Sequence, residues 1–163
     1  MTDAAIRNAL IDSYNNYALG VDTKNWPLVR SCFADEVSLD YGELSDSTGG
    51  SNVLRSSDDW VAILQGAING FDITRHAITN HRITVDGDNA VGIAYLDADH
   101  IILADSGINI ITPLDVVKLV GEYTNEYKLI DGLWKIVKSH LRADWISGNY
   151  DLFEKAQARA AEQ

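Results

Sequence analysis

The stretch TRHAITNHRITVDGDN, residues 74–89, decides how the fold of this chain is predicted. Its β-branched residues indicate a long strand, and the Asp-Gly-Asp-Asn run at its end indicates a hairpin turn. A strand needs no histidine in order to pair, yet this one carries His76 and His81. We expect His76 to face an internal pocket. His81 has the opposite strand parity unless a bulge intervenes, so we expect it on the outer surface or at an interface.

Three further long strands are expected downstream, separated by turn signals. They cover residues 90–103, 114–129 and 133–145. The pair Asp131-Gly132 predicts a second tight turn, and Asp105-Ser106-Gly107 predicts a looser connection. Because long antiparallel strands in a small domain usually curl, we expect a curved sheet.

Apolar residues at helical spacing predict helices before and after these strands. They are expected at residues 3–19 with Thr2 or Asp3 as N-cap and Gly20 as the end, at residues 25–32, from a cap at Ser57 or Asp58 to Gly70, and at residues 150–162. Residues 36–41 alternate as a further strand, and residues 42–57 are rich in Gly, Ser and Asp. That composition predicts a surface loop and a candidate lid.

Helices followed by long strands predict an α+β fold in a single domain, residues 1–163. We expect a cone-shaped, curved antiparallel sheet that is barrel-like. Three N-terminal helices would cover an internal pocket on its concave side, and the C-terminal helix would be short. Such a pocket holds one small ligand.

The composition limits the classes of binding partner and the cellular compartment that we expect for this protein. The formal net charge of −11 argues against nucleic acid, an anionic membrane surface or a polyphosphate ligand. A neutral small molecule fits that charge better. No long apolar run or secretory signal is visible, and the single cysteine, Cys32, fits a reducing cytoplasm. Long exposed strands favour a homo-oligomer, either a dimer or a trimer.

An ordered set of short motifs resembles the nuclear-transport-factor-2-like, or SnoaL-like, superfamily, and within it the scytalone dehydratases. The motifs are DTKNW at 22–26, VRSC at 29–32, LDY at 39–41, TRH at 74–76, ADH at 98–100 and YKLIDGLWK at 127–135. A related resemblance is to the hexachlorocyclohexane dehydrochlorinases, whose Thr-Asn-Glu-Tyr run recurs at residues 124–127. The likeness covers about residues 8 to 155 and implies the cone-shaped fold.

The resemblance implies that Asp22, Tyr41, His76 and His100 line the pocket of a cofactor-independent lyase. Elimination beside an activated C–H bond needs a base near neutral pKa, which imidazole supplies. A carboxylate such as Asp22 would fix the tautomer of His76 and balance its charge. Tyr41 would polarise a carbonyl group, and His100 would assist the leaving group. No metal or organic cofactor is expected.

Other positions would hold the substrate. The predicted contacts are Tyr17, Asn80, Tyr123 and Ser139. Several positions depart from the family: Val21 replaces a tyrosine, and Gly121 and Tyr123 stand where the dehydratases use Ser and Asn. We therefore expect a hydroxylated cyclic or aromatic substrate other than scytalone.

Three alternatives remain open. The same pocket could serve an isomerase or a polyketide-cyclase-like proton transfer. The fold also occurs in the non-catalytic small subunit of aromatic-ring-hydroxylating dioxygenases. Two histidines and a carboxylate, His76, His100 and Asp22, could in principle bind non-haem iron, although the resemblance points to a metal-free site. A plainer structural role for Asp22 is that of a helix cap.

Overall fold

The computed structural model describes residues 2–42, 52–104 and 110–162. In chain order the elements are α1 (Asp3–Asp22), α2 (Trp26–Ser31), β1 (Phe33–Asp40), β2 (Val53–Ser56), α3 (Ser57–Ile68), β3 (Ile73–Asp86), β4 (Asn89–Ile101), β5 (Val116–Ile130), β6 (Leu133–Gly148) and α4 (Leu152–Ala161). Residues 43–51 of the candidate lid lie outside the described residues, as does the connection predicted at Asp105-Ser106-Gly107.

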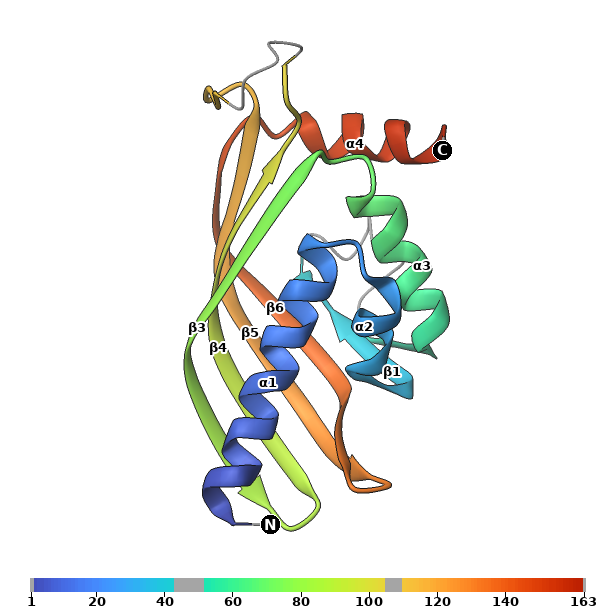
Figure 1. The fold of residues 1–163 in the computed structure, drawn as a ribbon, viewed down its shortest axis with the longest axis vertical. Coiled ribbons are helices and arrows are strands. Elements are labelled where there is room, and N and C mark those ends of the chain that lie inside the picture. The colour runs from blue at the N-terminus through green and yellow to red at the C-terminus, as the bar shows by residue number, and fades with distance from the viewer. Residues whose placement is uncertain (1, 43–51, 105–109, 163) are drawn as a thin grey trace.

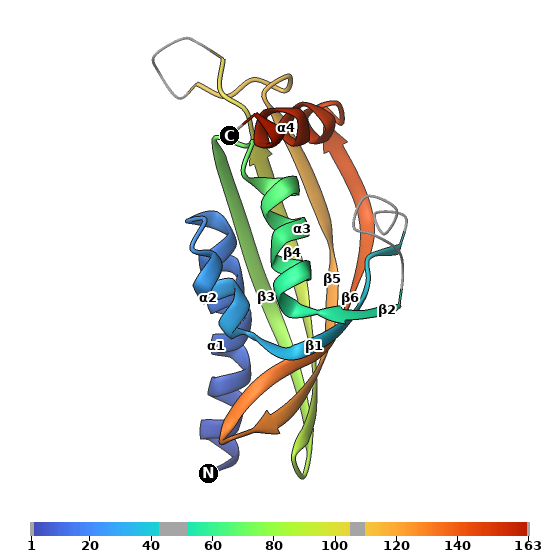
Figure 2. The same cartoon turned by 90° about the vertical axis from the view of Figure 1, so that its right-hand side faces the viewer.

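Six strands form one curved sheet in the order β2-β1-β6-β5-β4-β3 (Figures 1 and 2). The long strands β3 to β6 form the predicted antiparallel meander, with tight turns between Asp86 and Asn89 and between Ile130 and Leu133. The pairing of β1 with β6 is parallel, so the sheet is not purely antiparallel. The sheet does not close into a barrel, because β2 and β3 are its two free edges. The α+β cone is confirmed.

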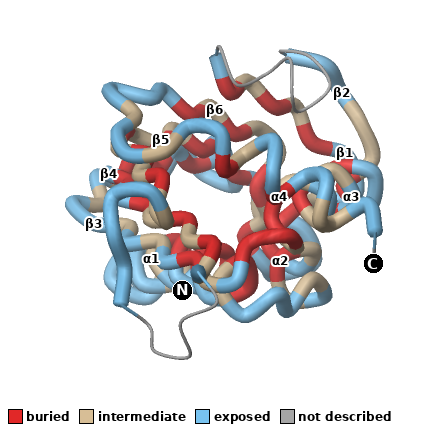
Figure 3. The backbone as a smooth tube through the Cα atoms, turned by 90° about the horizontal axis from the view of Figure 1, so that it is seen from above, coloured by how far each residue is buried: buried red, intermediate tan, exposed pale blue. Residues whose placement is uncertain are grey.

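The helices lie on the concave side of the sheet. Helix α1 runs along β3, α3 stands beside α2, and α4 lies across the wide end of the cone (Figure 1). Viewed from above, the buried segments face the space between the sheet and the helices, and the exposed segments lie outside (Figure 3). The core there includes Leu10 and Tyr14 of α1 and Trp60 of α3, each at most 1% exposed. None of the described helices is long and apolar enough to cross a membrane.

Several element boundaries differ from the prediction, and the region before α3 differs most. Residues 53–56 form the edge strand β2, antiparallel to β1, where a loop was predicted. Its pairing with β1 supplies backbone hydrogen bonds that the Gly- and Ser-rich composition does not reveal. Helix α3 is capped by Ser56, whose hydroxyl accepts a hydrogen bond from the Asp59 N–H at 3.1 Å, rather than by Ser57 or Asp58.

Helix α1 does not end at Gly20. It continues to Asp22, and Gly20 packs against α2. A Cβ atom added at Gly20 would lie 2.7 Å from Cγ2 of Val29. The glycine therefore allows two helices to pack closely, and the extra residues of α1 carry Asp22 to the start of β3.

A β-bulge interrupts β3. The pairing with β4 shifts between Thr79 and Arg82, and Asn80 has a φ of +56°. The extra residue turns His81 toward α1, where its ring lies 5.3 Å from the ring of Tyr14. The predicted surface position of His81 is therefore wrong, because the bulge reverses the parity of the strand beyond it.

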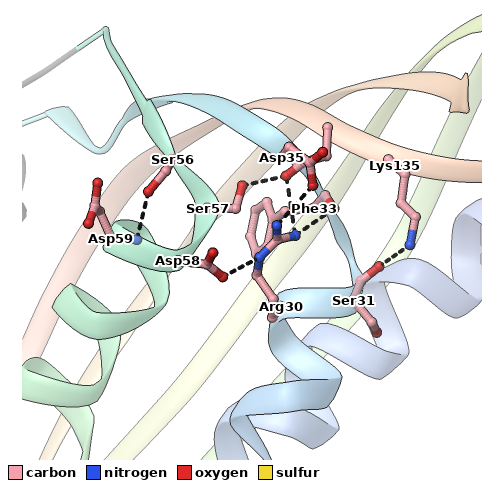
Figure 4. A network of polar contacts seen from close by, with 10 residues as sticks. Arg30, Ser31, Phe33, Asp35, Ser56, Ser57, Asp58, Asp59 and Lys135 are labelled. Atoms are coloured by element: carbon pink, nitrogen blue, oxygen red, sulfur yellow. Dashed lines mark hydrogen bonds and ion pairs between the residues drawn. The ribbon is translucent and has the colours of Figure 1, made fainter.

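One arginine joins three elements around the end of α2 (Figure 4). Nε of Arg30 donates to Asp58 of α3 at 2.7 Å, and a terminal nitrogen donates to Asp35 of β1 at 3.0 Å. The other terminal nitrogen donates to the carbonyls of Phe33 and Ala34, each at 3.4 Å. Arg30 thus holds α2, β1 and α3 together by its whole guanidinium group.

Replacing Arg30 by alanine should lower the free energy of unfolding by about 1–2 kcal/mol, because two carboxylates and two carbonyls lose one shared donor. Urea denaturation measures the change. Arg75→Ala is the matched control, since Arg75 is exposed and forms no ion pair among the described residues. Equal stability of the two variants would show that the network contributes nothing.

The end of the cone is fixed by a contact between two backbones. A Cβ atom at Gly70, just after α3, would lie 1.8 Å from the carbonyl oxygen of Ala156 in α4, whereas a Cβ at Gly66 would meet nothing within 4 Å. Gly70 therefore permits the seating of α4.

Gly70→Ala should destabilise the protein by about 2 kcal/mol or more, because α4 must move away. Gly66→Ala should instead stabilise it by up to about 1 kcal/mol through helix propensity. Thermal unfolding of both variants measures these opposite shifts. A Gly70→Ala protein as stable as the wild type would contradict the packing described for α4.

Candidate active site

A cavity of about 250 Å³ lies between the concave face of the sheet and helices α1, α3 and α4. Most of its lining is aliphatic or aromatic. The side chains with polar atoms are Tyr17, Tyr41, His76, His100, Tyr123, Tyr150, Glu154 and Gln157. An apolar enclosure with a few convergent polar groups is the usual form of a small-molecule site.

The strongest polar contact at this cavity joins His76 to Asp22. Nδ1 of His76 lies 2.7 Å from Oδ1 of Asp22, and the backbone N–H of His76 donates to Oδ2 at 2.9 Å. The hydroxyl of Thr74 donates to Oδ1 at 2.9 Å. The side chains of His76 and Asp22 are only 6% and 11% exposed. A carboxylate on Nδ1 fixes the ring and leaves Nε2 as the nitrogen available to a molecule in the cavity.

Asp22 lies behind His76 rather than in the cavity wall. It borders a separate polar groove between α1 and β3 on the outer side of the pair. Burial opposes ionisation of this carboxyl group, but the hydrogen bonds from His76 and Thr74 outweigh it and lower its pKa. The expectation that Asp22 lines the pocket is therefore wrong, while its contact with His76 is present. Asp22 also does not cap α2, whose N-cap is Asn25.

His100 lies beside His76 in the apolar end of the cavity. The ring centroids of the two histidines are 5.3 Å apart and the rings are nearly perpendicular. The rings of Phe71 and Phe153 lie 5.2 and 5.5 Å from His100. Burial, reinforced by the neighbouring His76, lowers the pKa of His100 to about 3, so its imidazole is neutral at neutral pH. Its Nδ1 is buried with no partner among the described atoms.

Three phenol groups form the other polar part of the cavity. Tyr17 of α1, Tyr41 at the end of β1 and Tyr123 of β5 are joined through their hydroxyls, and Tyr41 also bonds Ser139. Burial raises the pKa of all three hydroxyls, which therefore remain protonated. They offer hydrogen-bond donors to an oxygen atom in the cavity.

Two predicted substrate contacts do not line the main cavity. Asn80 is exposed at the bulge, because the extra residue there projects it out of the sheet. Ser139 is 3% exposed and lies behind the tyrosines, where it lines a much smaller internal space with Asn125. Tyr17 and Tyr123, in contrast, do line the cavity.

The sequence prediction missed several groups. Thr74 bonds Asp22 and stands two residues before His76, so strand alternation could have placed both side chains on one face. Phe153, Glu154 and Gln157 of α4 line the cavity. No sequence signal indicates how α4 folds back over the cone.

The described residues offer no evident metal site. Nowhere in residues 2–42, 52–104 and 110–162 do three or more His, Cys, Asp or Glu side chains gather so that they could hold a metal ion. The iron set of His76, His100 and Asp22 does not form, because Asp22 is engaged with Nδ1 on the far side of His76 from the cavity.

Comparison with known proteins identifies the fold family. Residues 2–140 match the model of the SnoaL-like domain. The Kfla4162 protein of Kribbella flavida is 26% identical, with a TM-score of 0.76 over 98% of this chain and 99% of that one. A LinA-type3 hexachlorocyclohexane dehydrochlorinase of Novosphingobium barchaimii is 19% identical, with a TM-score of 0.70 over 90% of this chain and 92% of that one.

A third solved structure is a scytalone dehydratase-like protein of Novosphingobium aromaticivorans. It is 18% identical, with a TM-score of 0.70 over 90% of this chain and 93% of that one. No curated protein matches the sequence. At identities below 25% such likenesses show the fold alone. The match to the family model covers most of the sequence, and the chain therefore belongs to the SnoaL-like domain family of the nuclear-transport-factor-2-like superfamily.

Proposed function

We propose that this protein is a cofactor-independent lyase of the dehydratase type, acting on a hydroxylated cyclic or aromatic small molecule. The observation that carries the proposal is the 2.7 Å contact between Nδ1 of His76 and Asp22 at the wall of a mostly apolar cavity. This contact leaves the other imidazole nitrogen of His76 to face the ligand space and balances the charge that the ring acquires on taking a proton.

The reaction would begin at a carbon beside a carbonyl group. Nε2 of His76 takes a proton from that carbon, and its electron pair moves toward the carbonyl, whose oxygen gains negative charge. The hydroxyl of Tyr41, linked to Tyr17 and Tyr123, donates to this oxygen. Asp22 stabilises the imidazolium form of His76.

The second half of the reaction expels the leaving group. The carbonyl group re-forms, and a C=C bond forms between the deprotonated carbon and the neighbouring carbon that carries the hydroxyl group. The C–O bond of that hydroxyl group breaks. The departing hydroxide takes the proton from His76 and leaves as water. His100 assists the leaving group through a hydrogen bond from its neutral ring. It does not act as a general acid, because an imidazole with a pKa of about 3 is not protonated at neutral pH.

The family comparisons support this class of reaction. The solved structures similar to this chain include a dehydrochlorinase and a scytalone dehydratase-like protein. Without a leaving group on the substrate, the same residues would move a double bond, so the isomerase alternative uses the same base. The mass of the product distinguishes the two, since elimination removes one molecule of water.

Turnover should depend on His76. A panel of cyclic β-hydroxy ketones would be screened with the wild-type protein by mass spectrometry, and variants would be compared on any substrate found. His76→Ala should lower kcat/KM by about 10³-fold, because general base catalysis is lost. Asp22→Asn should lower kcat while the fold persists.

His140→Ala provides the matched control. His140 also contacts an aspartate, Asp40 at 3.3 Å, but its side chain is 41% exposed and does not line the cavity. This variant should keep wild-type turnover. Near-normal activity of a folded His76→Ala protein would overturn the assignment of the base.

The buried state of His100 predicts a pH-dependent stability. Its pKa is lowered from 6.5 in the unfolded chain to about 3 in the folded protein, so between these values only the unfolded chain binds the proton. The free energy of unfolding should therefore fall as the pH drops from 6.5 to 3, by up to about 1.4 kcal/mol per unit from this group.

Chemical denaturation of wild type and His100→Leu across this range measures the effect. The difference in stability between them should change with pH below 6.5 and stay constant above pH 7. Parallel curves throughout would show that His100 is not held neutral by the fold.

A further inference from the structure

We infer that the cavity selects uncharged ring compounds and excludes carboxylates, and that Glu154 of α4 enforces this preference at the cavity opening. The inference deepens the proposed function, and it rests on that proposal only in taking the cavity as the place where the substrate binds. It concerns binding and does not require that any ligand be turned over.

The charges around the cavity are the first observation. Among the described residues that line it, no lysine or arginine is present, and Glu154 is the only carboxylate. Glu154 is exposed and has no ion-pair partner among the described residues. A side chain that both lines the cavity and meets solvent lies at its opening, so an entering ligand passes a negative charge.

The interior polar groups are the second observation. The hydroxyls of Tyr17, Tyr41 and Tyr123 are protonated, and His100 is neutral. His76 is paired with Asp22, so a proton on His76 is already matched by a carboxylate 2.7 Å away. None of these groups offers an unbalanced positive charge to a bound anion.

A carboxylate entering the cavity would lose its water and meet no compensating cation. That cost is several kcal/mol for a buried unpaired charge, whereas an amide or ketone of the same shape loses far less and gains the phenol donors. The net charge of −11 adds long-range repulsion of anions. Because the two ligands have the same shape, the difference between their affinities would come from electrostatics.

Three probes of nearly equal shape test this filter. They are 2-naphthamide, 2-naphthoate and 2-naphthamidine, which are neutral, anionic and cationic at pH 7.5. Their affinities for the wild-type protein would be measured by isothermal titration calorimetry at low salt. The naphthamide should bind most tightly, and the naphthoate should bind at least about 30-fold more weakly.

Two variants isolate the contribution of Glu154. Glu154→Gln should weaken binding of the naphthamidine about two- to fivefold, strengthen binding of the naphthoate by a similar factor, and leave the naphthamide unchanged. Glu162→Gln, near the other end of α4 and not in contact with the cavity, should change none of the three affinities.

Each outcome decides one part of the inference. Naphthoate binding as tightly as naphthamide, or naphthamide failing to bind, would overturn the charge selection. Identical affinities in the Glu154→Gln and Glu162→Gln proteins would overturn the role of Glu154. Turnover of the His76→Ala protein is measured in a separate experiment. If the lyase proposal fails while the affinities still show the charge preference, the two results are therefore distinguishable.

Discussion

The Asp22 carboxylate accepts three hydrogen bonds from two residues of β3, and the position of the site depends on it. Asp22 is the last residue of α1, so these bonds tie the end of the longest helix to the edge strand of the sheet. The same bonds hold the ring of His76. One buried acceptor therefore fixes both the packing of α1 and the direction of the imidazole.

The polar groups of the cavity are compatible with an apolar enclosure because they stay uncharged or paired. The tyrosine hydroxyls bond one another, and Asp22 and His76 form a pair. His100 is also uncharged, but its Nδ1 is buried without a hydrogen-bond partner among the described atoms. A polar atom left unpaired in a cavity wall is ready to bond a ligand, and it carries a cost in stability until one binds.

Much of this arrangement follows from the sequence alone. His76 was expected to face the pocket because a strand needs no histidine to pair, and the family resemblance implied the same for His100. Both line the cavity, as does the predicted contact Tyr17. The contact of Asp22 with His76 was predicted from the family resemblance, but its place outside the cavity wall was not, because that depends on α1 continuing past Gly20. Asn80 and His81 were misplaced for a related reason: a bulge adds one residue without a sequence signal strong enough to locate it. The residues of α4 were missed because their contacts are set by distant packing.

The bulge also divides β3 into two independently oriented halves. Before it, His76 lines the cavity, and just after it the ring of His81 packs against Tyr14 of α1. Removing one residue there would exchange the inner and outer faces of the second half while leaving His76 and its partner in place. Insertions and deletions at the bulge would thus alter the packing at the narrow end of the cone and leave the His76–Asp22 pair unchanged. Evolution or protein engineering could therefore change that end of the domain without changing the candidate catalytic residues.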